Sequence, residues 1–147
     1  TIRCHYSKTP FFDLYFPWCE KVYNSEWNYL LDLSLETIQY LKEELKIKTP
    51  IVRSSELGGV GNKTQRLISI CKKLGATHYL SGESAKNYIL DSEFSDQNIE
   101  LEYQEYKHPE YPQRYQGFVP FLSTIDLLFN CGEKSLGILK QPVPHCN

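Results

Sequence analysis

The feature that most constrains the fold is a strand–helix–strand pattern between residues 51 and 80. Residues 51–54 form a β-branched run between Pro50 and a glycine-rich stretch, which predicts a short strand. Residues 63–74 place apolar side chains on one face, which predicts a helix that ends at Gly75. Residues 77–80 predict a second strand. Because parallel strands need a crossover of about a dozen residues or more, this pattern indicates a right-handed parallel α/β unit.

Other segments extend this unit. Residues 99–106 alternate between apolar and polar side chains, which predicts a third strand. Residues 11–24 predict a short helix or two half-turns around Pro17, and residues 1–6 are typical of a strand or loop. Further helices are expected at 26–45, 84–90, 123–130 and 133–139, followed by a frayed tail at 141–147. The predicted fold class is α/β, with a short, mostly parallel three-strand core and helices on both faces, in a Rossmann-like three-layer arrangement.

Length and charge narrow the possible partners. A chain of 147 residues suits a single domain over residues 1–147. Its net charge of -2 gives no basic excess that would draw it to nucleic acid or an anionic membrane. No apolar run approaches the ~18 residues of a membrane-spanning helix, and no signal peptide pattern is visible. We therefore expect a soluble protein with a small-molecule substrate, no nucleic-acid partner and no membrane span.

The cysteines and histidines do not form a metal-binding pattern. The 5 cysteines are odd in number and contain no Cys-x-x-Cys pair, which argues against a zinc site and a disulfide framework. Cys71 lies in an apolar helical pattern and is expected to be a small buried hydrophobe. A reducing cytoplasm is the simplest location. The chain contains no Met, so we expect it to be part of a longer protein.

Polar residues follow each of the three predicted strands. They lie at 54–56, 81–84 and 106–108. Since ligands bind outside the carboxyl ends of strands in an open parallel sheet, we expect these residues to share one rim if the strands are neighbours. The rim residues are Ser54, Ser55, Glu56, Ser81 and Gly82, with Glu56 as a catalytic candidate. Ser84 is a suitable helix N-cap, and its surroundings lack the flanking glycine of a nucleophile elbow.

A glycine-rich loop precedes the helix at 63–74. Backbone N–H groups and the helix dipole favour an anion at such a loop. It is not a Walker A motif, because Leu57 and Asn62 stand where that motif needs glycine. The alternative is a flexible connection with a capped helix, its basic residues forming a solvated face. The candidate phosphate-binding residues are Gly58, Gly61, Lys63, Thr64 and Arg66.

A ring-rich loop at residues 108–115 forms a third candidate. Rings, an arginine and prolines at these positions suit the stacking and forked hydrogen bonds that bind a sugar or a base. Its candidates are His108 as an acid–base group, with Tyr111 and Arg114 as sugar-binding residues. The alternative is a loop pinned to the surface by its tyrosines.

Two single residues complete the set of candidates. His78, inside an apolar strand, is expected to be a core histidine. Asp126 lies on an apolar helix and needs a partner. It either provides a favourable charge in the first turn or serves as a buried anchor for the Arg114 loop.

The order of several blocks resembles the WbqC-like family over nearly the whole chain. These blocks are Ser54–Leu57, Asn62–Ile68, Leu74–Gly82, Ala85–Ile89, Tyr111–Gln113 and the distinctive closing block Phe118–Gly132. The family's N-terminal block, rich in aromatics and proline beside a Gln-Pro pair, is missing, and Ser84 stands where relatives often have glycine. The resemblance implies that the chain is the C-terminal portion of a longer bacterial protein.

The resemblance also implies a role in surface-glycan gene clusters, those for O-antigen or capsule. The leading hypothesis is an enzyme of polysaccharide biosynthesis, a transferase that acts on a nucleotide-activated or amino sugar. The alternative is a non-catalytic module of the same pathway that binds a glycan or a partner. Cofactor and oligomeric state are left open.

Overall fold

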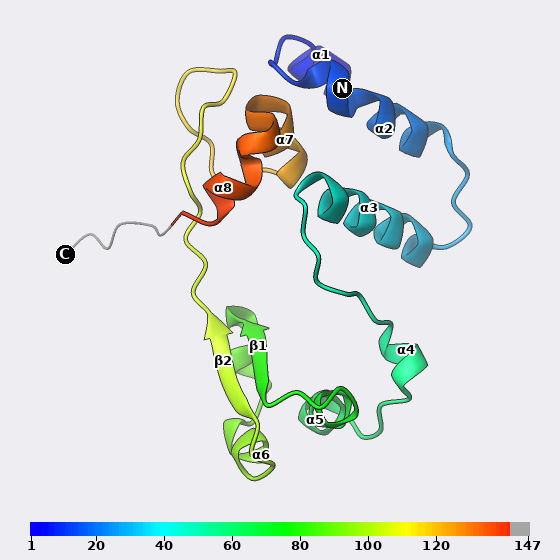
Figure 1. Ribbon diagram of the computed structural model, residues 1–147, viewed down its shortest axis with the longest axis vertical. Helices are drawn as coiled ribbons and strands as arrows, with labels where there is room; N and C mark the ends of the chain where they lie inside the picture. Colours follow the sequence, from blue (N-terminus) through cyan, green and yellow to red (C-terminus); the bar gives the residue numbers. More distant parts are fainter. Residues whose placement is uncertain (142–147) are drawn as a thin grey trace, which may run out of the picture. The chain divides into compact units, whose positions relative to one another are not determined.

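The computed structural model describes residues 1–141 and divides the chain into two compact units (Figure 1). Unit 1 consists of Thr1–Thr49 together with Lys107–Asn147, and unit 2 is the intervening stretch Pro50–Tyr106. Unit 1 is therefore discontinuous in sequence. No helix among residues 1–141 is both long and apolar enough to cross a lipid bilayer. The predicted frayed tail lies outside the described residues from 142 onward.

Unit 1 is built from helices. Its first segment holds α1 (Ile2–Tyr6), α2 (Phe12–Asn24) and α3 (Leu30–Glu44). Its second segment holds α7 (Thr124–Cys131), the 3-10 helix η2 (Gly132–Lys134) and α8 (Ser135–Leu139). The expected strand or loop at residues 1–6 was wrong, because these residues form α1. Pro17 lies inside α2, so residues 12–24 form one continuous helix rather than two half-turns.

The core of unit 1 is formed by residues from both of its sequence segments. Phe129 of α7 is fully buried, and its ring centre lies 5.0 Å from that of Tyr6 and 5.6 Å from that of Phe12. The buried residues of this core are Phe12, Tyr15, Cys19, Leu45, Leu128 and Phe129. Residues more than 100 positions apart in sequence thus form a single apolar cluster, which is why α7, predicted as an apolar helix, is buried along most of its length.

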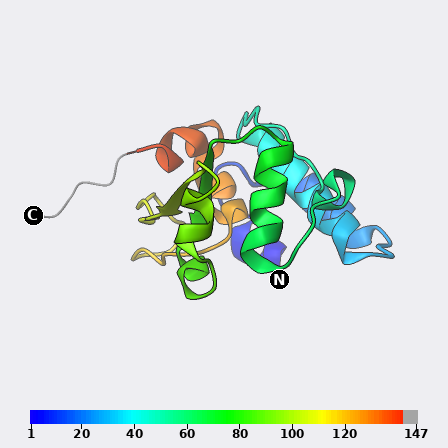
Figure 2. The same cartoon turned by 90° about the horizontal axis from the view of Figure 1, so that it is seen from below.

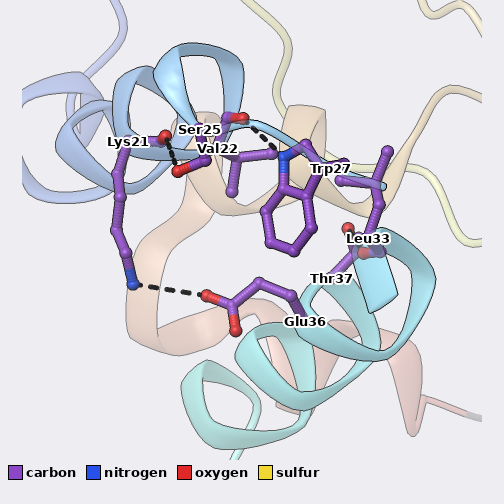
Figure 3. A network of polar contacts seen from close by, with 7 residues as sticks. All are labelled: Lys21, Val22, Ser25, Trp27, Leu33, Glu36 and Thr37. Atoms are coloured by element: carbon purple, nitrogen blue, oxygen red, sulfur yellow. Dashed lines mark hydrogen bonds and ion pairs between the residues drawn. The ribbon is translucent and has the colours of Figure 1, made fainter. Parts of the chain in front are cut away.

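Helices α2 and α3 are joined by stacking and by polar contacts. The Trp18 and Tyr40 rings stack with their centres 3.9 Å apart. Figure 3 shows the polar side of this contact, where Lys21 reaches Glu36 at 3.5 Å and the indole N–H of Trp27 donates to the carbonyl of Val22 at 2.9 Å. The Trp27 bond closes the turn between the two helices, while the exposed Lys21 ion pair adds little to stability.

Gly132 ends α7 in a conformation and a space that only glycine fits well. Its φ is +54°, in the left-handed region. A Cβ at this position would lie 2.5 Å from the Phe11 ring. The backbone N–H of Phe11 also donates to the carbonyl of Phe129 at 3.1 Å. The entry to α2 is therefore held directly against the end of α7.

Unit 2 contains a two-stranded parallel sheet with short helices. Strand β1 (His78–Gly82) pairs with β2 (Glu100–Gln104) in a register that places His78 opposite Glu100 and Gly82 opposite Gln104. The helices are α4 (Ser54–Leu57), α5 (Lys63–Lys73), the 3-10 helix η1 (Glu83–Asn87) and α6 (Asp91–Ser95). Figure 2 shows α5 as the long green helix beside the paler green segment that contains η1 and α6.

The core of unit 2 lies between α5, α6 and the sheet. Its buried residues are Ile68, Cys71, Ala85, Ile89, Phe94 and Ile99. The prediction that Cys71 is a buried hydrophobe is confirmed, since the residue is 4% exposed. Gly75, after the end of α5, has a φ of +65°, which agrees with the predicted left-handed helix end.

The fold is mixed α/β, and the three-strand core was not found among residues 1–141. The predicted strand at residues 51–54 was wrong: residues 51–53 have no regular structure, and α4 begins at Ser54. Ile51 and Val52 are 44% and 48% exposed, so no neighbouring strand covers them. The parallel crossover connects β1 to β2 through η1 and α6, while α5 precedes both strands.

Candidate functional site

The clearest candidate site is a groove in unit 2 at the N-terminal end of α5. We call it the Lys63 groove, and it has a volume of about 670 Å³. One wall comes from the start of α5 and the other from the segment between η1 and α6. Its lining residues are Asn62, Lys63, Thr64, Gln65, Lys86, Asn87, Tyr88, Ile89, Leu90 and Glu93.

Thr64 joins the two walls of the Lys63 groove. The side chain is 3% exposed, and its hydroxyl oxygen accepts a hydrogen bond from the backbone N–H of Leu90 at 3.3 Å. Ile89, the residue before Leu90, is buried in the unit 2 core. Because this contact fixes the floor of the groove, Thr64 has a structural function whether or not it also touches a ligand.

Lys63 opens α5 in a strained backbone conformation. Its φ is +45°, although it carries a side chain, and it directly follows the extended residue Asn62. Such left-handed residues cost on the order of 1–3 kcal/mol and gather at ligand-binding sites. The exposed Lys63 side chain lines the groove at the first turn of α5, where the N–H of Gln65 donates to the carbonyl of Asn62 at 3.1 Å.

Lys86 supplies the second cation of the groove from η1. Its ammonium lies 3.8 Å from the carboxylate of Glu83 and 5.3 Å from the ring centre of Tyr103. Because this ion pair is long and exposed, it leaves most of the Lys86 charge available. Tyr103 in turn donates to Asp91 at 2.8 Å, and burial together with this bond raises the pKa of Tyr103 to about 12.

The electrostatics of the groove favour an anion at the α5 end. Lys63 and the positive end of the helix dipole lie there, Lys86 lines the groove from η1, and Glu93 on α6 is the carboxylate of the lining. Tyr88, which is 54% exposed, offers an aromatic face on the opposite wall. This arrangement is suited to a ligand that combines a phosphate with a ring.

The glycine loop lies beside the groove and is held from its other side. Gly58 ends α4 with a φ of +56°. The Lys73 ammonium donates hydrogen bonds to the carbonyls of Leu57 and Gly58 at 2.7 and 2.8 Å, and the N–H of Val60 donates to the Ser69 hydroxyl at 3.2 Å. The loop is therefore held against α5 by hydrogen bonds that its carbonyls accept from Lys73 and that its Val60 N–H donates to Ser69. Gly58, Gly61 and Arg66 are not among the lining residues of the Lys63 groove.

The predicted strand-rim residues are divided between two elements. Ser54, Ser55 and Glu56 are exposed on α4, so they do not follow a strand, and Glu56 forms a 3.9 Å ion pair with Arg53. Ser81 and Gly82 do end β1, with Ser81 buried at 7% exposure. None of these five residues lines the Lys63 groove.

The ring-rich loop belongs to unit 1, where Asp126 holds it in place. Tyr111 is 7% exposed and donates to the buried Asp126 carboxylate at 2.8 Å. Gln113 donates to the same carboxylate at 3.2 Å and also forms two bonds with the backbone of Val119, at 2.9 and 2.8 Å. Asp126 is therefore a buried anchor for this loop, which it holds through Tyr111 and Gln113.

The other predicted residues of this loop also have partners within unit 1. The Arg114 guanidinium donates to the carbonyl of His5 and lies 5.1 Å from the ring centre of Tyr115. His108 is half-buried, with its ring centre 5.2–5.9 Å from those of Tyr111, Phe118 and Phe121. These contacts favour the interpretation of a loop pinned by its own side chains.

His78 differs from its prediction. It was expected in the core, but its side chain is 71% exposed and its Nε2 lies 2.9 Å from the carboxylate of Glu100 on the neighbouring strand. The two-stranded sheet leaves this face of β1 open, which explains the difference. Within residues 1–141, no group of three or more His, Cys, Asp or Glu residues is placed to hold a metal ion.

Sequence reasoning missed four residues of the groove that carry its chemistry. They come from the segment after β1 and from α6: Lys86, Asn87, Tyr88 and Glu93. The first three fall in the Ala85–Ile89 block of the family resemblance, which was the available signal. No sequence feature placed Glu93 beside the start of α5.

Comparison with known proteins identifies the family of this mixed α/β chain. The model of the WbqC-like protein family matches residues 1–138, and the chain belongs to this family. A curated relative is the uncharacterized protein Rv1507c of Mycobacterium tuberculosis (strain ATCC 25618 / H37Rv), which is 30% identical over 141 residues. The match covers 95% of this chain and 61% of that relative. No solved structure gives a significant match.

Proposed function

We propose that the chain acts in bacterial surface-polysaccharide biosynthesis, as part of a transferase that binds a nucleotide-activated or amino sugar. In this proposal, the Lys63 groove holds the phosphate of the sugar donor. The observation that carries it is the convergence of Lys63, Lys86 and the start of α5 on one groove. The family resemblance supports a function in this pathway, and the lysines of the groove support the binding of a phosphate.

The volume and charge of the groove support a phosphorylated ligand. Ligand sites commonly span roughly 300–1,000 Å³, and the Lys63 groove lies within that range. Hydrogen bonds to charged groups each contribute about 1.5–3 kcal/mol. Lys63 and Lys86 would contact the phosphate oxygens, and the amides of Asn62 and Asn87 would complete its surroundings. Tyr88 would stack on the base or sugar ring.

The acid–base group of the transferase is a separate part of the proposal. Glu56 in unit 2 and His108 in unit 1 remain its candidates, and Glu93 joins them because it lines the Lys63 groove itself. Ser54, Ser55, Ser81 and Gly82 are proposed contacts for the acceptor. A group that serves as a base must come within hydrogen-bond reach of the acceptor hydroxyl.

A non-catalytic glycan-binding function is the second candidate. It is favoured by exposed rings in unit 1, where Phe121 is 76% and Tyr115 60% exposed. Phe121 has a φ of +60°, and the bonds between Gln113 and Val119 hold the loop before it. A rigid loop with outward-facing rings is suited to stacking on the apolar face of a sugar.

Titration of the full chain with nucleotide sugars tests the proposal. We would measure dissociation constants for UDP-glucose, UDP-N-acetylglucosamine and GDP-mannose by isothermal titration calorimetry. Replacing Lys63→Met or Lys86→Met should weaken binding at least about tenfold, which corresponds to 1.4 kcal/mol. The control Lys8→Met, on an exposed lysine of unit 1, should leave affinity unchanged.

Two outcomes would decide against the phosphate-binding groove. In one, no nucleotide sugar binds the folded chain. In the other, binding is insensitive to both lysine replacements. If glycan fragments bind instead, and Phe121→Ala abolishes that binding, the glycan-binding function is supported.

A further inference from the structure

Tyr103 contacts two of the elements that form a wall of the Lys63 groove. Its side chain is half-buried on β2 and packs against the core of unit 2. The register of the sheet pairs Tyr103 with Ser81, close to the point where η1 begins at Glu83. Tyr103 is not among the lining residues of the groove. Any effect of Tyr103 on a ligand therefore passes through a neighbouring side chain.

One neighbour of Tyr103 is Lys86, the lysine that η1 contributes to the groove. The Lys86 ammonium lies 5.3 Å from the centre of the Tyr103 ring, within the roughly 6 Å over which an aromatic face attracts a cation. The backbone of η1 is also held in place, because Ala85 is buried and its carbonyl accepts from the N–H groups of Tyr88 and Ile89 at 3.1 and 3.0 Å. The ring thus restrains the mobile end of a side chain whose base is already fixed.

The other neighbour of Tyr103 is Asp91, the first residue of α6. The phenol donates to the Asp91 carboxylate at 2.8 Å, which connects β2 with the start of α6. Because this bond uses the hydroxyl, the face of the ring is left for the ammonium of Lys86. Tyr103 is therefore held from both the core and α6 while it contacts Lys86.

We propose that Tyr103 is a positioning residue, which holds Lys86 in the orientation that binds the phosphate. The inference rests on the proposed function, because it needs the phosphate in the Lys63 groove. A lysine has a long flexible stem, and a ligand that fixes this stem loses affinity through the conformational entropy of the side chain. A ring that restrains the ammonium beforehand reduces this loss, and it adds no negative charge that would repel the phosphate.

Glu83 also lies near Lys86, but it acts on an anion in the opposite direction. Its carboxylate is 3.8 Å from the ammonium, beyond hydrogen-bond distance, and its side chain is 74% exposed. Solvent weakens such a pair, and the negative charge of Glu83 repels a phosphate bound to Lys86. Glu83→Gln should therefore not weaken phosphate binding, whereas removal of the Tyr103 ring should.

Calorimetric titration of the full chain with UDP-glucose, UDP-N-acetylglucosamine and GDP-mannose tests this role. Tyr103→Leu keeps an apolar side chain in the core but removes the ring, and should weaken binding about threefold to fivefold. Tyr103→Phe keeps the ring and should retain the affinity of the parent chain. In Lys86→Met, Tyr103→Leu should cause no further loss, because the ring acts only through the ammonium. If Tyr103→Leu does not fold, Tyr103→Met is the second non-aromatic variant.

Tyr79→Leu is the matched control. Tyr79 is a half-buried ring of β1 in the same core, with its centre 5.3 Å from that of Phe94. Its replacement also disturbs the core but leaves the ring beside Lys86, so affinity should not change. Nuclear magnetic relaxation at the Lys86 Cε measures the restraint without a ligand. The order parameter should fall in Tyr103→Leu and keep its parent value in Tyr103→Phe and Tyr79→Leu.

The outcomes separate this inference from the proposed function. If Tyr103→Leu costs the same affinity in Lys86→Met as in the parent chain, the positioning role is overturned and the phosphate site remains. An unchanged order parameter in Tyr103→Leu, or an equal loss of affinity in Tyr79→Leu, would also overturn it. No binding of any of the nucleotide sugars to the folded parent chain would overturn both proposals. Thermal unfolding confirms that each variant is measured as folded protein.

Discussion

Polar and aromatic side chains are buried and hydrogen-bonded to one another in unit 1, around Asp126, but are exposed to solvent in the Lys63 groove of unit 2. In unit 1, Asp126 accepts hydrogen bonds from Tyr111 and Gln113 inside the protein. In unit 2, Lys63 and Tyr88 are exposed toward a groove. A buried carboxylate whose acceptor sites are filled stabilises a fold, whereas exposed charges beside an open hollow are available to a ligand.

This difference shows that a polar, aromatic composition does not identify a binding site by itself. The loop at residues 108–115 carries the rings and the arginine of a sugar-binding site, yet its side chains bind one another and α7. The segment at residues 86–93 carries fewer such residues but presents them to solvent. Burial and hydrogen-bond partners therefore discriminate between structural and ligand-binding functions, and mutations can test that division.

Removal of the Asp126 carboxylate should have the largest effect. Asp126→Ala leaves the hydroxyl of Tyr111 and the amide of Gln113 without their acceptor, and should lower the free energy of unfolding by about 3–4 kcal/mol. Both tryptophans, Trp18 and Trp27, lie in unit 1, so urea unfolding followed by tryptophan fluorescence reports on this unit.

Asp13→Ala is the control for that experiment. Asp13 is an exposed carboxylate of α2 in the same unit, so its replacement should cost less than about 0.5 kcal/mol. A loss at Asp126 no larger than at Asp13 would contradict the anchoring role of the buried carboxylate.

Alkaline pH should disrupt the same cluster. Burial, followed by a hydrogen bond to Asp126, raises the pKa of Tyr6 from 10.0 to about 12. The fold therefore favours the protonated phenol. Its contribution to stability is complete below pH 10 and is lost as the pH rises through 12. Absorbance titration of phenolate should show a component with this raised pKa that disappears in Tyr6→Phe.

Asp126→Asn tests how much the Asp126 carboxylate contributes to the raised pKa of Tyr6. Loss of the negative charge should move the Tyr6 pKa toward 10, because it removes the hydrogen-bond and charge contributions and leaves the effect of burial. If the titration of Tyr6 is the same in Asp126→Asn and in the parent chain, the carboxylate is not what holds the phenolic proton.

A matched pair of tyrosines compares the two units directly. Tyr111→Phe removes a buried hydrogen bond to a carboxylate and should cost about 1.5–3 kcal/mol. Tyr88→Phe removes an exposed hydroxyl and should change stability by less than about 0.5 kcal/mol. Chemical unfolding of the two variants side by side measures both values. Equal costs would remove the distinction between the two regions.

The smallest expected effect is a gain in stability at Lys63. Lys63→Gly relieves the left-handed backbone strain, which costs an L-residue roughly 1–2 kcal/mol. The greater flexibility of glycine in the unfolded chain lowers the free energy of unfolding and offsets part of this gain. We expect a net gain of about 0.5 kcal/mol together with weaker binding of nucleotide sugars. Thermal unfolding and calorimetry on the same sample measure the two effects. A loss of stability would show that Lys63 is not strained.

Much of the fold was predictable because local signals and tertiary structure agree. The apolar residues of α5 and α7 predicted both helices, and the structure adds that the Ser123 hydroxyl caps α7 by accepting from the N–H of Ile125 at 3.4 Å. The two strands at residues 77–80 and 99–106 were also predicted. In α5, α7 and β2 the hydrophobic pattern matches the face that the structure buries, whereas β1 exposes Leu80 and buries Ser81.

The errors arose where a short segment has no decisive local signal. Four β-branched and polar residues at 51–54 are compatible with a strand, but a strand also needs a partner, and residues 51 and 52 stay exposed. His78 was assigned to the core because both faces of β1 were expected to be covered. A sheet of two strands leaves room for the exposed pair of His78 with Glu100.

The candidate site was predicted in part for a similar reason. The basic and glycine-rich start of α5 was visible in the sequence, and Lys63 and Thr64 do line the groove. The opposite wall depends on how α6 packs against α5, which is a tertiary contact between residues far apart in sequence. Glu93 could not be assigned before that packing was known.

The discontinuity of unit 1 has a consequence for synthesis on the ribosome. Unit 2 ends at Tyr106, so every residue it needs has been made before α7 is translated. Unit 1 cannot close its core until Leu128 and Phe129 arrive to meet Phe12 and Cys19. Chains grow at roughly 5–20 residues per second. The apolar surface of α2 therefore stays uncovered for seconds during synthesis. In that time unit 2 is complete and can fold, whereas the second segment of unit 1 has not yet been made.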